Sequence, residues 1–265
     1  MAVEQTTAFD PRTNSREDPR FLSSVERGLS VLEALSDSSG PMSLTEIARI
    51  TGLAVPTLQR LTATLVQAGY LEKEADSKRY CPTVKTVDLL FSYLSRNQFA
   101  KRAWPHLVKL REDLGLDVSL AVPSGTSMIY VHRLPGYAGN FENTLPGKKI
   151  PIHLSASGRC VLSLENVGKV EGFLNSAVLE PLTPWSIVDP ETILSEIAKC
   201  REIGYAVVKQ EDASGTISLA CPVTKTFKAV AGISVHAPVA GLDILDFVSK
   251  VLPSVVAVSN ALSET

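Results

Sequence analysis

The sequence predicts an α+β protein with a small N-terminal winged helix-turn-helix domain, a linking helix and a larger C-terminal domain of helices and strands. Its 265 residues, 45% of them hydrophobic, suit either one large domain or two ordinary ones. Hydrophobic residues recur at helical spacing up to about Leu114, and short strand-like runs dominate after Gly115. This change of pattern indicates two domains with different secondary structure.

The composition argues against several classes of protein. A net charge of −2 is not the basic signature of a nonspecific nucleic-acid binder. The sequence has no apolar run of the roughly 18 residues that span a bilayer and no signal-peptide core, so we expect a cytoplasmic protein without a membrane partner. Four scattered cysteines without a Cys-x-x-Cys pair predict reduced, buried thiols, and we expect no metal or other cofactor.

Residues 1–20 are expected to form a disordered arm, because they are polar and offer little that would offset the entropy of ordering them. Arg12, Arg16 and Arg20 are candidates for contact with DNA phosphates. Neighbouring Asp and Glu residues dilute that positive charge, so a solvated tail is the preferred interpretation.

A helix-turn-helix is predicted after this arm. One helix is expected over residues 24–35. Ser43 and Glu46 then have the spacing of a capping box, in which each side chain bonds the backbone of the other residue, and the box opens a short helix over 44–50. A glycine-containing turn separates this helix from a third one over 56–68, which is the arrangement of a helix-turn-helix.

Two short strands over residues 70–72 and 79–81 are expected to pair across a polar tip and form a wing. The third helix turns leucines to one side and hydrogen-bonding side chains to the other, as reading of the major groove requires. A solvated helix face and a solvated hairpin would show the same polar pattern. Candidate base or phosphate contacts are Thr57, Gln59, Arg60 and Thr64 in this helix, and candidate phosphate contacts elsewhere are Arg27, Lys73, Lys78 and Arg79.

A linker helix is predicted over residues 84–98, with Asn97 and Gln98 as a hinge before further helix up to Leu114. This linker could pack against a partner subunit or within its own chain. The predicted organisation is an arm over 1–20, a DNA-binding domain over 21–83, the linker over 84–98 and a sensor domain over 99–265.

The sensor domain is predicted to alternate strands with helices. A hairpin is expected first, and a glycine-rich loop over residues 136–147 follows it. A later helix begins at Asp189-Pro190 and should turn Ile193, Ile197 and Ile203 inward. The expected strands cover 118–122, 128–132, 205–209, 217–222 and 229–236, and the last helix covers 242–262.

Several motifs occur in an order that is similar to one known family. They are SVERGLSVL at 24–32, LTEIA at 44–48, TLQRL at 57–61, PIHLSASGR at 151–159, REIGYA at 201–206 and GISV at 232–235. From about Phe21 to the C-terminus, the chain resembles the isocitrate-lyase-regulator (IclR) family of bacterial transcription factors. Its DPRF sequence at 18–21 is similar to the subgroup that controls the breakdown of aromatic acids.

This resemblance implies a GAF-like sensor domain and a homodimer or homotetramer, formed through the linker helix and the DNA-binding domains. It also implies double-stranded DNA as partner, bound at a near-palindromic operator of a catabolic operon, and a small organic or aromatic acid as effector. No catalytic residue is expected.

The resemblance also implies an effector pocket. The backbone N–H groups of Ala156 and Ser157, at the start of a helix, would bind a carboxylate, and such a position suits an anion physically. Ser218, Ser234 and His236 match positions whose side chains reach the effector. Val208, where some members have an acid, and Thr216, where a larger apolar residue can occur, depart from the family pattern. We therefore expect an effector with an apolar or aromatic body and one carboxylate.

Three alternatives remain open. An enzyme could use Cys160 as a nucleophile beside His153, but Cys160 lies in an apolar helical stretch, which favours an inert core thiol. A metal sensor is disfavoured, because the four histidines are widely spaced. A regulator could also act through a protein partner without any effector, and a ligand-induced rise in melting temperature would distinguish that case.

Overall fold

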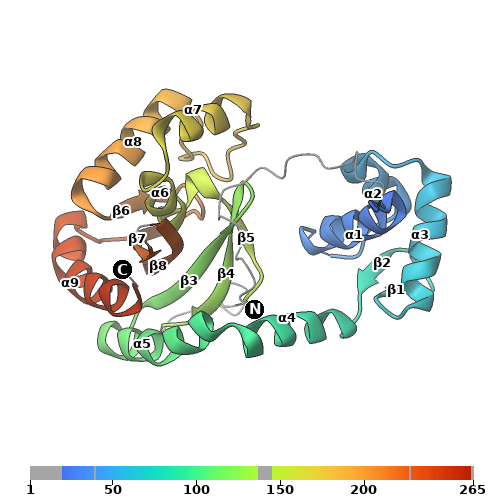
Figure 1. Ribbon diagram of the computed structural model, residues 1–265, viewed down its shortest axis with the longest axis horizontal. Coiled ribbons are helices and arrows are strands. Elements are labelled where there is room, and N and C mark those ends of the chain that lie inside the picture. Colours follow the sequence, from blue (N-terminus) through green and yellow to red (C-terminus); the bar gives the residue numbers. More distant parts are fainter. Residues whose placement is uncertain (1–19, 39, 137–144, 227, 264–265) are drawn as a thin grey trace. The chain divides into compact units, whose positions relative to one another are not determined.

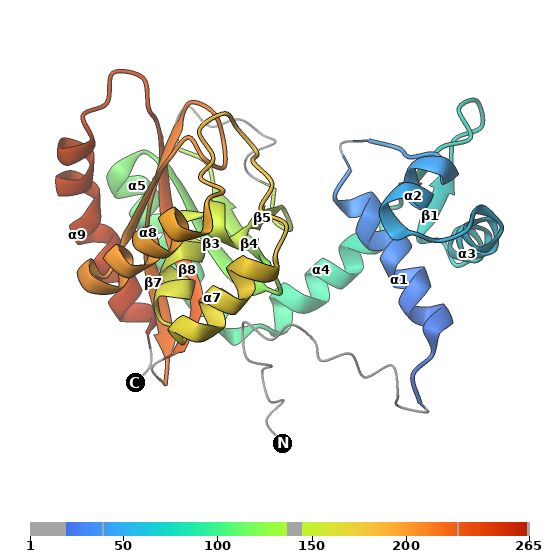
Figure 2. The same cartoon turned by 90° about the horizontal axis from the view of Figure 1, so that it is seen from above.

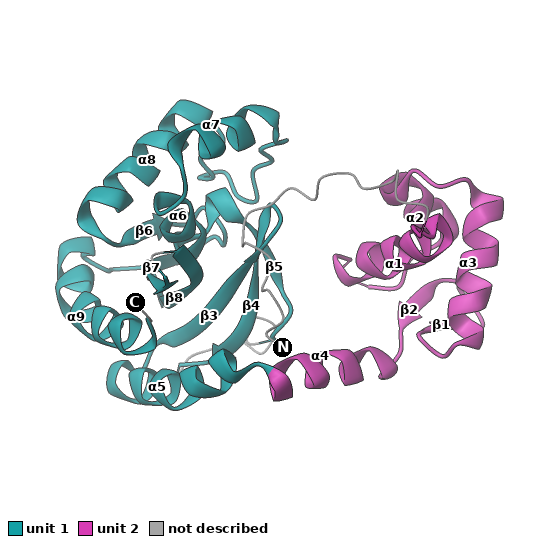
Figure 3. Cartoon of the chain, viewed as in Figure 1, with its two compact units in different colours: residues 1–11, 97–265 teal, residues 12–96 magenta. Residues whose placement is uncertain are grey.

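The computed structural model describes residues 20–38, 40–136, 145–226 and 228–263 (Figure 1). Two compact units make up the chain, one of residues 12–96 and one of residues 1–11 with 97–265 (Figure 3). The division falls near the end of the segment predicted as a linker helix. All but Arg20 of the predicted arm, and residues 137–144 of the glycine-rich loop, lie outside the described residues.

The N-terminal unit is a winged helix-turn-helix, as the sequence predicts. Its helices are α1 (Ser23–Ser36), α2 (Leu44–Thr51), α3 (Val55–Gln67) and α4 (Lys85–Arg96), and its strands are β1 (Leu71–Lys73) and β2 (Tyr80–Pro82). The capping box is present, since Ser43 Oγ accepts from Glu46 N and Glu46 Oε2 accepts from Ser43 N. Leucines and other apolar residues of α1, α2, α3 and β1 form the small core of this unit.

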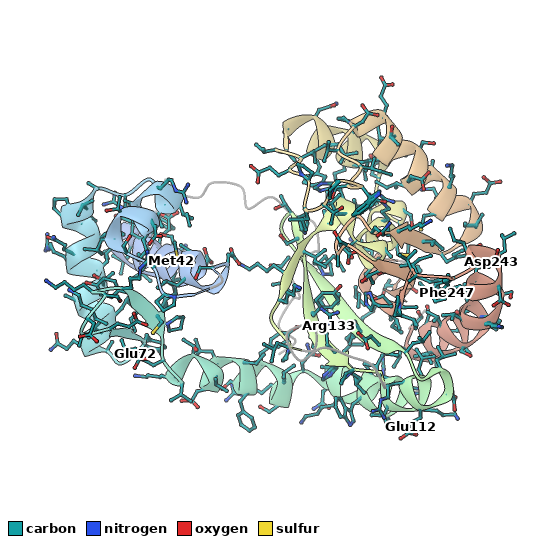
Figure 4. All side chains as sticks on the ribbon, turned by 180° about the vertical axis from the view of Figure 1, so that it is seen from behind. Met42, Glu72, Glu112, Arg133, Asp243 and Phe247 are labelled. Atoms are coloured by element: carbon teal, nitrogen blue, oxygen red, sulfur yellow. The ribbon has the colours of Figure 1, made fainter. Side chains whose placement is uncertain are left out.

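The wing is tied to the loop between α1 and α2. Strands β1 and β2 pair antiparallel, with Glu72 opposite Cys81. Met42 pairs with Tyr80 on the other edge of β2, so the wing extends a backbone ladder that begins before α2. Figure 4 labels Met42 and Glu72 in this region. The two backbone hydrogen bonds between Met42 and Tyr80 therefore hold the wing to the segment that precedes α2.

The C-terminal unit contains a six-stranded antiparallel sheet with the strand order β5-β4-β3-β8-β7-β6 (Figure 2). Its two longest strands, β7 and β8, lie side by side at positions four and five of this order, and their pairing is broken by one register shift. The strands are β3 (Asp117–Ser124), β4 (Ser127–Leu134), β5 (Lys149–Pro151), β6 (Ala206–Lys209), β7 (Thr216–Lys225) and β8 (Lys228–Pro238).

Helices cover both faces of this sheet. Alternate residues of β7, such as Ile217 and Leu219, face a core shared with α5 and α9, where Phe247 is buried (Figure 4). The residues between them face α6, since Ala220 packs with Cys160. The helices are α5 (Gln98–Leu114), α6 (Ala156–Ser163), α7 (Val167–Ser176), α8 (Pro190–Ile203) and α9 (Ile244–Leu262), and a 3₁₀ turn covers Ile152–Leu154.

Two sequence expectations need correction. Ile203, expected to face inward, is 53% exposed, because Cys200, seven residues after Ile193, takes the inward position on α8. Among the described helices, α9 is long and apolar enough by length and composition to cross a membrane, although no such segment was expected. Its apolar face is nevertheless used within the unit, where Phe247, Val251 and other α9 residues pack on the sheet.

Candidate functional site

The predicted contact residues of α3 lie on its outer side. Pro56 stands in the first turn, and Leu58 and Thr62 are buried against the core. Because Thr57, Arg60 and Thr64 are spaced three and four residues apart, they share one face of the helix. The side chain of Thr57 is half-buried, and those of Gln59, Arg60 and Thr64 are exposed.

The four other candidate DNA contacts differ in how accessible they are. Arg27, Lys73 and Lys78 are exposed, and Lys78 has a left-handed backbone conformation at the wing tip. Arg79 is occupied within the chain, because its Nη1 atom lies 2.9 Å from Glu46 Oε2 and donates to the carbonyl of Pro41. Arg79 thus joins the wing to α2, and its contact with a DNA phosphate stays a prediction.

Glu46 is the partner that holds Arg79. Hydrogen bonds from the backbone and the hydroxyl of Ser43, and then the nearby Arg79 guanidinium, lower the pKa of Glu46 to about 2. One carboxylate therefore caps α2 and anchors the wing, and it stays ionised over the physiological pH range.

The predicted effector residues of the C-terminal unit gather around the start of α6. Ser155 is the N-cap, and its Oγ atom accepts from Gly158 N at 3.3 Å. Every residue of α6 is buried, including Ala156 and Ser157. Gly232 of β8 lies directly against Ser157, so the strand and the first turn of α6 approach as closely as their backbones allow.

A chain of buried polar side chains links this turn to the sheet. The hydroxyls of Ser218 and Ser234 bond the two ring nitrogens of His236, at 2.7 Å to Nδ1 and 3.1 Å to Nε2. Ser157 Oγ donates to Ser234 Oγ at 3.4 Å. Burial, and then the positive charges of Arg133 and Lys148, lower the pKa of His236 to about 3. The ring is therefore neutral at physiological pH, with one nitrogen donating and the other accepting.

The two residues that depart from the family pattern, Val208 and Thr216, lie near this polar cluster. Val208 is fully buried beside Ala156 and Cys160, and it stands opposite Ser218 in the sheet. Thr216 is half-buried and lines a small cavity next to His236. The structure thus brings the seven predicted effector residues to one side of the sheet, around α6.

Sequence reasoning missed the charged residues of this cavity. It has a volume of about 40 Å³. The carboxylate of Asp212 lies at the cavity, and burial raises its pKa. Position 208 itself carries no acid, but the turn after β6 places Asp212 at this cavity. The lining residues are Asp117, Tyr130, Arg133, Lys148, Ile150, Asp212, Ala213, Thr216 and His236.

A buried ion pair fixes the turn that carries Asp212. Arg159 Nη2 lies 2.6 Å from Glu211 Oε2, and both side chains are almost fully buried. Arg159 Nε also donates to the carbonyl of His153, and Glu211 accepts from Ile187 N at 3.1 Å. The pair joins α6 to the β6–β7 turn, so the position of Asp212 depends on it. The REIGYA and PIHLSASGR motifs do not indicate this partnership.

The residues of the enzyme alternative do not form a nucleophile–base pair. The thiol of Cys160 donates to the carbonyl of Ala220 at 3.2 Å and lies 3.7 Å from Cys200 Sγ. Burial raises the pKa of Cys160 well above its usual value, which disfavours a thiolate. Burial also lowers the pKa of His153 to about 4, and its Nε2 atom has no hydrogen-bond partner among the described residues.

Known proteins match the chain over nearly all of its length. A model of the IclR helix-turn-helix domain matches residues 24–75, and a model of the C-terminal domain of the bacterial transcriptional regulator IclR matches residues 91–264. The Pca regulon regulatory protein of Pseudomonas putida is 26% identical over 247 residues, which cover 92% of this chain and 84% of that protein. These relatives are regulators of transcription and not enzymes.

Solved structures share the fold. The IclR transcriptional regulator from Alicyclobacillus acidocaldarius superposes with a TM-score of 0.78 at 24% identity, covering 92% of this chain and 98% of the other. An IclR homologue from Microbacterium hydrocarbonoxydans, in complex with 4-hydroxybenzoate, superposes with a TM-score of 0.69 at 20% identity, covering 90% and 98%.

Proposed function

Because this chain belongs to the IclR family of transcriptional regulators, we propose that it binds a specific DNA operator and that a small organic or aromatic acid controls this binding. The observation that carries the DNA-binding part is the exposed polar row on α3, where Arg60 stands between Thr57 and Thr64. Such a row can donate to and accept from base edges in the major groove. Its target is DNA, so the protein would act in the cytoplasm.

The oligomeric part of the proposal is a homodimer, or a tetramer made of two dimers, on a near-palindromic operator. Helix α4 has no buried residue, and Phe91 is 71% exposed on it. Leu22 and Leu29 are likewise exposed beside and on α1. Apolar surface of this kind suits an interface with a second copy of the chain, and a two-fold dimer reads two half-sites.

The effector part of the proposal is supported by the polar groups around α6. Its chemistry follows the relatives, one of which regulates the pca regulon while another is bound to 4-hydroxybenzoate. A cavity of about 40 Å³ holds little more than a water molecule, so effector binding would select a more open arrangement of the pocket. The linker helix would pass that change to the DNA-binding unit. The target would be an operon for the breakdown of such acids.

A gel shift with the purified protein and DNA from upstream of its own gene tests this function. We expect saturable binding that resists competitor DNA and weakens as salt rises, because phosphate contacts release counterions. The same assay with candidate acids tests effector control, and a rise in melting temperature with an acid would argue against the effector-independent alternative. The absence of specific binding to any promoter, with or without acids, would contradict the proposal.

A further inference from the structure

Two buried cysteines of the C-terminal unit lie next to each other. Helix α8 packs on α6 (Figure 1), and the Sγ atom of Cys200 on α8 is 3.7 Å from the Sγ atom of Cys160 on α6. The two sulfurs of a disulfide are about 2.05 Å apart, so a movement of less than about 2 Å would join them. The side chains packed around the pair are small, and they include Ala156, Ala206 and Ala220.

Hydrogen bonds between α6 and α8 keep the two sulfurs adjacent. Arg201, which follows Cys200, donates from Nε to the carbonyl of Ser163 at 2.6 Å and from Nη2 to the carbonyl of Glu165 at 2.8 Å. The hydroxyl of Ser163 in turn donates to the carbonyl of Cys160 at 2.8 Å. These bonds hold the end of α6 beside the last turn of α8, where Cys200 lies.

The two thiols differ in acidity. A hydrogen bond with Cys160 lowers the pKa of Cys200, although burial opposes this effect. The positive charges of Arg159 and Arg201 act in the same direction as the hydrogen bond. In the other three cysteines of the chain, burial raises the pKa of the thiol. Because the thiolate is the form that attacks an oxidant, Cys200 would react first.

Cys200 also lies close to solvent. It is 2% exposed and is the last buried residue of α8, which ends at Ile203. Its neighbours Lys199 and Arg201 are both exposed. The ends of helices open more readily than their interiors, so a brief opening of this last turn would admit a molecule as small as hydrogen peroxide.

We propose that Cys160 and Cys200 are a redox-sensitive pair of thiols that a hydroperoxide oxidises to a disulfide. The bond would tie α6 to α8. In the reducing cytoplasm it would be transient, because other thiols reduce it again. This site goes beyond the proposed control by DNA and an acid, and its test does not depend on either.

The oxidation takes place in two steps. The Cys200 thiolate attacks one peroxide oxygen, the O–O bond breaks, and the other oxygen takes a proton and leaves as an alcohol, or as water from hydrogen peroxide. Cys200 is then a sulfenic acid. The sulfur of Cys160 attacks the sulfur of Cys200, the S–O bond breaks, and the hydroxide leaves as water with the Cys160 proton. The two thiols thus lose two electrons and two protons, and the hydroperoxide gains them.

Peptide mapping tests the bond directly. We would use the full-length protein with Cys81→Ser, which removes the half-buried thiol of the wing and leaves three cysteines. The reduced protein is treated with hydrogen peroxide, its remaining thiols are alkylated in denaturant, and its tryptic peptides are identified by mass spectrometry. We expect a linked pair of peptides that contain Cys160 and Cys200, with Cys221 alkylated. Dithiothreitol should restore both thiols.

Variants of the same protein test each sulfur. With Cys200→Ala, the thiol of Cys160 should survive the peroxide. With Cys160→Ala, Cys200 should stop at the sulfenic acid, which dimedone labels. Cys221→Ala is the matched control, because it removes another buried thiol of the same unit and should leave the bond intact. Circular dichroism establishes that each variant is folded.

Urea unfolding tests whether the folded protein accommodates the bond. The two cysteines are 40 residues apart along the chain, and a link between them restricts the unfolded chain. The oxidised protein should therefore unfold at a higher urea concentration than the reduced one, whereas peroxide should not produce this rise in the Cys200→Ala variant.

Three results would overturn the proposal. They are the absence of the linked peptides from the parent protein, a link that involves Cys221 instead, and a fall in the urea midpoint on oxidation. The last result would mean that the bond forms only in molecules that have already opened.

Discussion

Gly232 of β8 lies so close to Ser157 of α6 that a Cβ atom at position 232 would stand 2.5 Å from Ser157 Cβ and 2.8 Å from its Cα. Real Cβ atoms do not approach other atoms this closely, so any side chain here must push α6 away from the sheet. The contact therefore sets the distance between the strand that carries His236 and the helix that carries Ser157.

Gly232→Ala should lower the free energy of unfolding by about 1–3 kcal/mol, the usual effect of overpacking a core. Urea unfolding followed by circular dichroism measures this. Gly172→Ala is the matched control, because position 172 lies in α7 with nothing within 4 Å of an added Cβ. That change should raise stability by up to about 1 kcal/mol, since alanine favours a helix. Equal effects of the two substitutions would contradict the close-contact argument.

The buried pair of Arg159 and Glu211 gives a second prediction. Arg159→Met should cost about 3–5 kcal/mol of unfolding free energy, because it leaves the Glu211 carboxylate buried without its cation. Adding Glu211→Gln should recover part of that loss, since a neutral amide is less costly to bury.

The exposed pair of Lys199 and Glu196 is its control. Lys199→Met should cost no more than about 1 kcal/mol, because water already solvates both charges. Denaturation curves of the parent protein, Arg159→Met, Arg159→Met with Glu211→Gln, and Lys199→Met measure these differences in unfolding free energy. A small loss for Arg159→Met would show that the ion pair does not hold α6 to the β6–β7 turn.

On the DNA side, Arg60→Ala should weaken operator binding by about 1–3 kcal/mol and lower the salt slope by about one if Arg60 contacts a phosphate. Gel shifts over a range of salt concentrations measure both quantities. Lys250→Ala removes the same charge from an exposed position on α9 and should leave both unchanged. Wild-type affinity in a folded Arg60→Ala protein would remove this residue from the DNA contacts.

The buried imidazole of His236 predicts a dependence of stability on pH. Its pKa of about 3 lies below the value near 6.5 of an unfolded histidine, so between these values the unfolded chain binds more protons. The contribution of this group to stability is therefore complete above about pH 6.5 and is lost as pH falls toward 3. His153, with a pKa of about 4, acts in the same direction.

His236→Gln should therefore flatten part of the acid-side loss of stability, because glutamine does not gain a proton in this range. Thermal unfolding at a series of pH values from about 7 to 4 compares the variant with the parent protein. An unchanged dependence of stability on pH in the variant would mean that the His236 ring gains its proton without opening the polar cluster around it.

The sequence was most informative where one helix or strand carries its own signal. Ser43 and Glu46 indicate the start of α2, because a capping box involves only four consecutive residues. Alternation along β7 likewise separates Ile217 from Ser218, since side chains on a strand alternate between faces. The winged helix-turn-helix and most strands could be predicted on such grounds.

The charged cavity could not be predicted in this way. Arg133 lies in β4, Lys148 precedes β5 and Asp212 lies in the β6–β7 turn, so only the order of strands in the sheet brings them together. Periodicity gives the face of each strand but not its neighbours. The intrachain partners of Arg79 could not be predicted for a similar reason, because Pro41 and Glu46 lie more than thirty residues away along the chain.

The complete burial of α6 has a consequence for hydrogen exchange. All eight of its residues lie between the sheet and the outer helices, so its backbone amides can meet solvent deuterium only when those layers separate. They should exchange at the rate of the slowest amides in the C-terminal unit. In a single chain, helix α4, which has no buried residue, should exchange much faster, and a second copy packed on it would slow this exchange. Within one chain the two helices should thus lie at opposite ends of the range of local stabilities.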